Sequence, residues 1–155
     1  MKRVLIYILI VAALLLVPLE RADVADLRPV QTVALYKTPE GYRIETDTED
    51  AGNGKTVDGA YKDLIDTTPG VIYLDTADYL LVSEAALPAL ESIDKYLKNG
   101  VRVCGVIGEA DLKEVSKFLS VQTGLRPFSQ AGFGGTMPFL DCRTDRIKFL
   151  QKNVK

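Results

Sequence analysis

The chain begins with a run of apolar residues that shows no periodicity. Lys2 and Arg3 precede residues 4–19, which are all apolar and are interrupted only by Pro18. As a helix this run is about 24 Å long, which is short of a hydrocarbon core of roughly 30 Å, but the charged residues that follow it can extend its effective length. Because basic residues stay on the cytoplasmic side, we expect a single-pass helix over residues 1–20 in the cell membrane, with the rest of the chain extracytoplasmic.

A cleaved signal peptide is the alternative interpretation of this run. Cleavage needs small residues in an A-x-A-like pattern, but cleavage after Ala22 would put Glu20 at the −3 position. No cysteine directly follows the run, so a lipid attached there is excluded. We favour an uncleaved signal-anchor followed by a linker over residues 21–29, and cleavage stays open.

The polar and apolar positions of residues 30–48 predict a β-hairpin. Val, Leu and Tyr are prominent in residues 30–37, and Pro39 and Gly41 fit the special positions of a tight turn. In residues 42–48 the side chains alternate: Tyr42, Ile44 and Thr46 face one way, and Arg43, Glu45 and Asp47 face the other. This pattern is typical of a half-buried antiparallel strand.

The next segment predicts a loop followed by a helix. Residues 49–55 are polar and glycine-rich, so we expect a loop there. Thr56 is suited to cap a helix over residues 57–67, where apolar side chains recur at helical spacing. Pro69 and Gly70 end this helix.

Three short apolar runs predict further strands. Residues 71–74 are expected to form a buried strand, and residues 79–82 a strand or the start of a helix. Residues 101–107 also predict a strand. These runs alternate with helical patterns, which favours strands of one sheet with helices packed on it.

Two helices are expected between and after these runs. Ser83 can cap a helix whose apolar stripe extends to Leu97, and Gly100 lies where that helix should end. Asp111 with Glu114 three residues later predicts a capping box at the start of the last helix.

The pattern weakens after residue 119. Residues 121–155 are predicted as a loop-rich tail, in which residues 139–140 and 147–150 are either short elements that pack back or part of a frayed end. The domain over residues 30–120 is therefore predicted as an α/β fold of the α+β type. We expect a mixed sheet of four to five strands, opened by the antiparallel hairpin, packed by about three helices and preceded by the N-terminal transmembrane helix.

Composition excludes several classes of function. The 155 residues include no histidine, so Ser-His-Asp and Cys-His catalysis and His-ligated metal sites are excluded. Without residues 1–20 the chain keeps 17 basic and 20 acidic residues, which does not suit nucleic acid or an anionic lipid surface. We expect no enzyme activity, no cofactor and no metal.

The sequence Gly54-Lys55-Thr56 resembles the end of a phosphate-binding loop. The full motif needs a glycine five residues before Gly54, where this chain has Glu49, and a carboxylate there repels phosphate. The preceding strand also alternates, whereas the central strand of a nucleotide-binding fold is buried on both faces. We therefore interpret the segment as a glycine loop that leads into a Thr-capped helix.

The two cysteines leave two interpretations open. Cys104 falls in a predicted core strand and Cys142 in the predicted tail. Outside the membrane they could pair and hold the tail against the sheet, or Cys104 could be a buried free thiol.

The order of these elements resembles the N-terminal domain of the C-subunits of spore germinant receptors, the Ger(x)C family. The matching residues within about 30–120 are Gly54-Lys55-Thr56 with Ala60, then residues 71–74, then Leu80-Leu81-Val82-Ser83-Glu84. That family is anchored through a lipidated cysteine at the end of its signal, which this chain lacks. The resemblance implies a membrane-tethered, non-enzymatic domain of a spore-forming bacterium, tied to sporulation or germination, and it carries over no catalytic residue.

We expect the outer domain to act by contact with a membrane or cell-envelope protein. The candidate surfaces are the strand face formed by Arg43, Glu45 and Asp47, and the glycine-rich loop that contains Phe133. A solvated sheet face is the alternative interpretation of the first surface. The second functional hypothesis is an extracytoplasmic binder of a small molecule or a cell-wall fragment, which needs a concave pocket with convergent polar groups.

Overall fold

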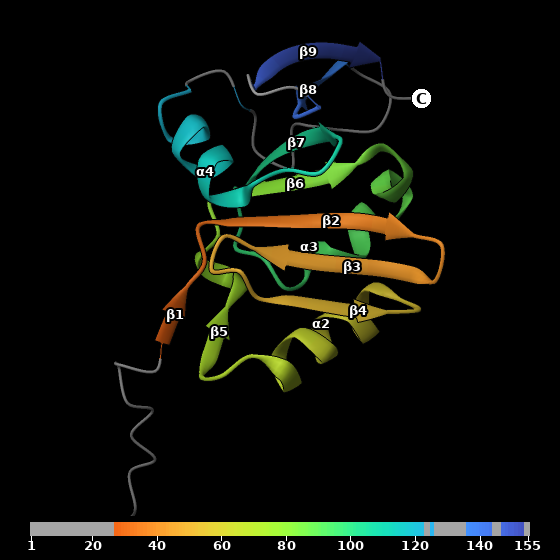
Figure 1. Ribbon diagram of the computed structural model, residues 1–155, viewed down its shortest axis with the longest axis vertical. Coiled ribbons are helices and arrows are strands. Elements are labelled where there is room, and N and C mark those ends of the chain that lie inside the picture. The colour runs from red at the N-terminus through yellow and green to blue at the C-terminus, as the bar shows by residue number, and fades with distance from the viewer. Residues whose placement is uncertain (1–26, 123–124, 126–135, 144–146, 154–155) are drawn as a thin grey trace, which may run out of the picture.

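A mixed seven-stranded sheet forms the centre of the computed structural model, which describes residues 27–122, 125, 136–143 and 147–153 (Figure 1). The strand order is β4-β3-β2-β6-β7-β8-β9. The strands are β2 (Thr32–Thr38), β3 (Gly41–Thr46), β4 (Ala51–Gly54), β6 (Tyr79–Ser83), β7 (Arg102–Ile107), β8 (Thr136–Asp141) and β9 (Lys148–Asn153). The fold is therefore α+β, as the sequence predicts, but its sheet has seven strands rather than four to five.

The middle of the sheet is parallel and its two sides are antiparallel. Neighbours in the series β2, β6, β7 and β8 all pair in parallel. The β2–β3 hairpin turns between Thr38 and Gly41, as predicted, and β3 pairs antiparallel with β4 on one side, as β8 does with β9 on the other. Strands β6 and β7 are buried on both faces for most of their length, which is typical of parallel strands covered by helices.

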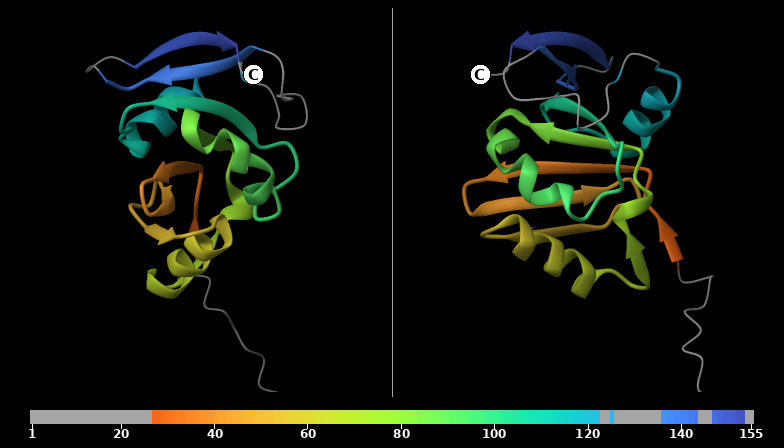
Figure 2. Two further views of the ribbon diagram at one scale, coloured as in Figure 1. Left: turned by 90° about the vertical axis from the view of Figure 1, so that its right-hand side faces the viewer. Right: turned by 180° about the vertical axis from the view of Figure 1, so that it is seen from behind.

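Helices cover both faces of the sheet. On one face α2 (Val57–Thr67) and α3 (Leu90–Asp94) pack on alternate strand residues such as Leu35 and Leu80. On the other face α4 (Leu112–Ser120) packs on Ala34 and Leu81. Figure 1 has α4 in front of the sheet, and the view from behind in Figure 2 brings α3 to the front.

The predicted helix α2 and the predicted cap of α4 by Asp111 are confirmed. Helix α2 covers residues 57–67, and the Thr56 side chain accepts a hydrogen bond of 3.1 Å from the Gly59 amide. Helix α4 begins after Asp111, whose carboxylate accepts hydrogen bonds from the amides of Lys113 and Glu114.

The predicted helix from Ser83 to Leu97 is largely wrong. Residues 84–89 form a 3₁₀ helix that contains Pro88, and only the five residues of α3 are α-helical. Proline lacks an amide hydrogen and clashes with the preceding turn, so a continuous α-helix through it is unfavourable. The Ser83 hydroxyl instead accepts a hydrogen bond from the amide of Lys37.

The predicted loop at 49–55 is wrong in part, because residues 51–54 form strand β4. Its sequence contains two glycines, which local propensity assigns to a loop. Both glycines lie against the backbone of α2, so the absence of a side chain lets the helix approach the strand closely.

The predicted loop-rich tail contains two strands of the sheet. β8 pairs with β7, and β9 pairs with β8 along six residues. Phe139 and Leu140 are completely buried, on opposite faces of the sheet. The alternative in which residues 139–140 and 147–150 pack back on the domain is the one the structure supports.

A second, smaller sheet lies at the start of the domain. β1 (Leu27–Pro29) pairs in parallel with β5 (Val71–Tyr73), so the predicted linker ends in a short strand. The run at 71–74 is thus outside the main sheet, and Val71 and Tyr73 are exposed rather than buried. Only Ile72 and Leu74 point into the core.

The predicted membrane helix at residues 1–20 lies outside the described residues. Among the helices that the structure does describe, none has the length and hydropathy needed to cross a bilayer.

Candidate functional site

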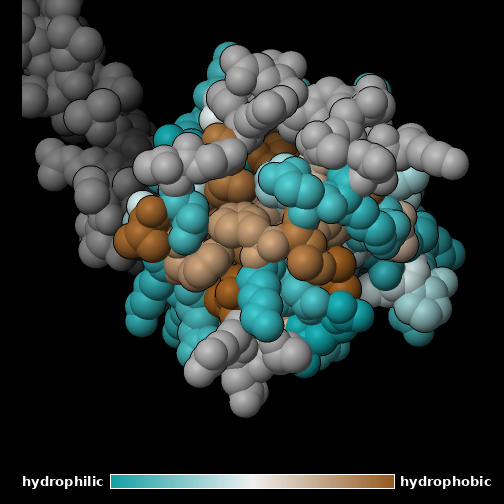
Figure 3. Space-filling model, turned by 90° about the horizontal axis from the view of Figure 1, so that it is seen from above, coloured by the Kyte–Doolittle hydropathy of each residue, from teal (hydrophilic) through white to brown (hydrophobic). Residues whose placement is uncertain are grey.

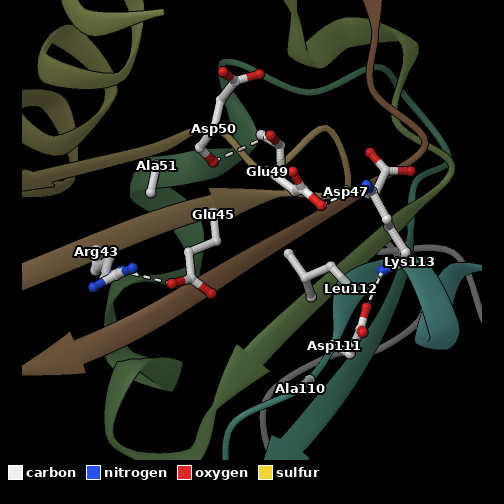
Figure 4. Close-up of a pocket in the computed structure, with 11 residues that line it drawn as sticks. Arg43, Glu45, Asp47, Glu49, Asp50, Ala51, Ala110, Asp111, Leu112 and Lys113 are labelled. Carbon is white, nitrogen blue, oxygen red and sulfur yellow. Dashed lines mark hydrogen bonds and ion pairs between the residues drawn. The ribbon is translucent and has the colours of Figure 1, made fainter.

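A cleft of about 360 Å³ opens between β3, the turn after it and the start of α4 (Figure 4). It is formed by three segments: Arg43, Glu45 and Thr46 on β3; Asp47, Glu49, Asp50 and Ala51 after it; and Ala110, Asp111, Leu112 and Lys113 at the start of α4. Five carboxylates and two basic side chains are among these residues, so the cleft is acidic.

The alternation of β3 supplies one wall of the cleft. Ile44 is fully buried under α2, so its neighbours Arg43 and Glu45 emerge on the opposite face, the one that α4 covers in part. The short helix α4 lies over β2, β6 and β7 but leaves this part of β3 open, and its capped first turn forms the second wall.

The turn that follows β3 is held by its own hydrogen bonds. The Thr46 amide donates to the Asp50 carbonyl, and the Glu49 amide donates to the Thr46 carbonyl. Glu49 has a φ of 68°, in the left-handed region, which directs the chain back into β4. The turn thereby presents the Glu49 side chain at the mouth of the cleft.

Two ion pairs lie at the rim of the cleft, one partly buried and one exposed. Arg43 Nε lies 2.6 Å from Glu45 Oε1, and Lys113 Nζ lies 2.5 Å from Glu49 Oε1. The Lys113 and Glu49 side chains are 56% and 75% exposed, so their pairing contributes little to stability and can be exchanged for other charges.

The other carboxylates of the cleft are engaged by the protein itself. Asp50 is only 11% exposed, pairs with Arg28 at 3.1 Å and accepts a hydrogen bond of 2.7 Å from Thr48 Oγ1. Asp111 caps α4. These carboxylates shape the cleft, and Glu45 and Glu49 are left as the acidic groups at its rim.

Asp47 occupies the inner corner of the cleft. Its carboxylate accepts hydrogen bonds of 3.2 and 3.3 Å from the Gln31 amide, and Ser116 of α4 donates to the Gln31 side chain. Burial raises the pKa of Asp47 above its ordinary value, although these hydrogen bonds act in the opposite direction.

Metal ligation and thiol chemistry are the two further possibilities for the described residues. No group of three or more acidic or thiol side chains in the described part of the chain is arranged to hold a metal ion. Cys104 and Cys142 are both free, and burial raises the pKa of both thiols, that of Cys104 to about 12. Neither therefore provides a reactive thiolate at neutral pH.

The structure brings three of the predicted surface residues together, since Arg43, Glu45 and Asp47 all line the cleft. Phe133, the fourth, lies outside the described residues. The sequence drew attention to Glu49 as a residue that repels phosphate, and it gave no sign of Lys113, because nothing local indicates that the start of α4 lies beside β3. The cap at Asp111 marked the start of that helix but not its position.

The Gly54-Lys55-Thr56 segment joins β4 to α2 and does not form a phosphate loop. A Cβ on Gly54 would lie 2.2 Å from the amide nitrogen of Ala60, so the helix already covers the Gly54 backbone. A phosphate cradle needs such a backbone open to the ligand.

No family model, no curated protein and no solved structure matches this chain.

Proposed function

We propose that this chain is a membrane-tethered, non-enzymatic domain that acts outside the cytoplasmic membrane by contacting another protein. The observation that carries the proposal is the acidic cleft between β3 and α4, with the ion pairs Arg43–Glu45 and Lys113–Glu49 at its rim. Such pairs favour a polar contact, because a partner can replace each internal partner with a charge of its own.

The excess of carboxylates indicates that the partner's contact segment carries basic side chains. Carboxylates outnumber basic side chains among the residues of the cleft, and Glu45 and Glu49 at its rim can attract Lys or Arg side chains, of which Arg can bind a carboxylate through two hydrogen bonds. The described cysteines are not activated thiols, and the chain has no histidine to serve as a general base. Both observations favour recognition over catalysis.

The membrane tether is the second part of the proposal. Residues 4–19 are apolar and follow Lys2 and Arg3, which is typical of a signal-anchor that leaves the rest of the chain outside. A tether confines the domain to the bilayer surface and so raises its concentration near a membrane or cell-envelope partner. The setting of sporulation or germination rests on the Ger(x)C resemblance alone, and neighbouring germination or sporulation genes would support it.

Site-specific photocrosslinking in cells that make the protein tests the contact. A photoreactive residue is placed at Lys113 at the rim, and a control at Glu91, exposed on α3 on the opposite face. We expect one discrete adduct from position 113, lost when Glu45→Lys reverses the charge at the cleft, and none from position 91. Equal adducts from both positions, or none from position 113, would contradict the proposal.

A binder of a small molecule or a cell-wall fragment is the second candidate. The cleft volume of about 360 Å³ is within the range of ligand pockets, and this observation favours it. A melting screen of the purified protein with polar amines and cell-wall fragments separates the two candidates. A ligand that raises the melting temperature of the wild type but not of Glu45→Lys, without any protein partner, would favour this second function.

A further inference from the structure

We propose that the corner where α2 meets β5 rests on the lipid surface, with Ile65, Val71 and Tyr73 in the membrane interface. We call these three residues the α2–β5 corner. They are 38%, 42% and 38% exposed. The proposal rests on the proposed membrane tether and adds how the domain is oriented on the bilayer.

The corner consists of three exposed apolar residues on two consecutive elements, α2 and β5. Val71 and Tyr73 point the same way from β5, on the side opposite the buried Ile72. Ile65 lies in the last turns of α2, and a tight connection through Pro69 and Gly70 joins α2 to β5. Figures 1 and 2 show β5 and the end of α2 at the end of the molecule remote from β9.

The chain enters the domain at this corner. In the β1–β5 pair Leu27 lies opposite Val71, and Pro29 lies opposite Tyr73. The exposed face of β5 therefore belongs to the strand directly beside the point where the N-terminal segment joins the fold. A membrane that holds residues 4–19 therefore also keeps β5 close to its surface.

The length of the connection makes the restraint tight. Eight residue steps separate Leu19, the end of the apolar run, from Leu27, and they span at most about 29 Å when fully extended. A compact domain of this size is about 35 Å across. A tether shorter than the domain keeps β5 near the headgroups and keeps β9 farther away.

The side chains suit the membrane interface rather than bulk water. Tyrosine is enriched at headgroup level, where its ring is apolar and its hydroxyl remains hydrated, and Ile and Val favour the acyl boundary. Charges close to the corner are mixed, with Lys62 and Asp66 both exposed on α2. Docking should therefore depend on apolar contact and be insensitive to salt.

The far end of the sheet offers a matched control. Leu150 on β9 is 42% exposed, the same fraction as Val71. Figure 3 looks onto that end and shows apolar surface interrupted by polar side chains. Exposure alone would make the two ends equivalent, whereas the tether distinguishes them.

Fluorescence of the full chain in protein-free phosphatidylcholine vesicles tests the proposal. An environment-sensitive probe is attached to Val71→Cys or to Leu150→Cys in a Cys142→Ser background, in which Cys104 is buried and unreactive. We expect a blue-shifted emission and weaker quenching by aqueous iodide at position 71 than at position 150, unchanged at high salt. The ratio between the two positions removes the effect of mixed orientation in the vesicles.

Further variants and outcomes make the test decisive. Ile65→Gln combined with Tyr73→Gln should return the position-71 probe to water, whereas Val121→Gln, at a residue 74% exposed, should not. Equal quenching at positions 71 and 150 in chains that float with the vesicles would overturn the docking and leave the tether intact. Shielding of position 71 only in native membranes would also overturn it, in favour of a protein neighbour. Chains that do not float with vesicles at all would overturn the tether itself.

Discussion

The ring of Phe139 fills the space that a side chain at Gly105 would need. The two residues lie opposite each other between β7 and β8, and a Cβ on Gly105 would lie 2.3 Å from Phe139 Cε1. Phe139 is completely buried, so its ring has little room to move away. This contact anchors the C-terminal strands in the core of the sheet.

Gly105→Ala should therefore lower the free energy of unfolding by about 1–3 kcal/mol, the usual effect of overpacking a core. The second variant Phe139→Leu should offset part of this loss, because a smaller side chain vacates the contested space. Urea unfolding of the two single variants and the double variant measures the coupling. Simple additivity of the two effects would show that the contact does not exist.

The close contact of β4 with α2 predicts opposite effects on stability for two glycine substitutions. A Cβ on Gly52 would lie 2.3 Å from the Leu64 nitrogen, whereas one on Gly59 would come no closer than 3.4 Å to the Thr56 hydroxyl. Gly52→Ala should destabilise the fold by about 1–3 kcal/mol. Gly59→Ala, within the helix, should stabilise it by about 0.5–1 kcal/mol. Thermal melts of both variants that shift in the same direction would contradict this packing.

The helix cap at Thr56 can be separated from any role of Lys55. Thr56→Ala removes the acceptor of the Gly59 amide and should cost about 1 kcal/mol. Lys55→Ala changes an exposed side chain and should alter stability by less than about 0.5 kcal/mol. Chemical denaturation measures the stability effect of each substitution, and added ATP should change neither effect. A melting temperature that rises with ATP in the wild type but not in Lys55→Ala would restore the phosphate-loop interpretation.

The raised pKa of Asp47 predicts a pH dependence of stability. Because its folded-state pKa lies above its unfolded value of about 3.8, the folded chain binds the proton more tightly, and stability falls as pH rises through this window. Asp47→Asn keeps an acceptor for the Gln31 amide without the charge. Its stability relative to the wild type should therefore increase from pH 3 upward and level off above the folded-state pKa, as measured by urea unfolding across pH. Parallel pH profiles for the two proteins would contradict the burial of this carboxylate.

The local sequence pattern predicted the elements in which one face is buried and the other is exposed, because the spacing of their apolar residues then follows the secondary structure. Strand β3, α2 and α4 were predicted because their polar and apolar residues recur at the period of a strand or a helix, and β2 was predicted from its Val, Leu and Tyr content. Apolar spacing alone gives a wrong prediction around Pro88, since the spacing there is helical but the proline excludes a continuous α-helix.

The remaining elements depend on contacts between distant segments. Gly52 suits a strand only because α2 lies against it, and β8 is held by the Gly105–Phe139 contact. The cleft has the same origin. Arg43, Glu45 and Asp47 share a face by strand alternation, but Lys113 reaches them from a helix more than 60 residues away.

Chemical labelling of intact cells shows directly whether the domain lies outside the membrane with its cleft covered by a partner. In a Cys142→Ser background, Lys113→Cys at the rim and Glu91→Cys on the opposite face are treated with a membrane-impermeant maleimide, and the rates are compared with those of the purified protein. Both positions should react from outside, with position 113 slowed relative to the purified protein and position 91 unchanged. Labelling only after lysis, or labelling of both positions at the rates of the purified protein, would contradict this expectation.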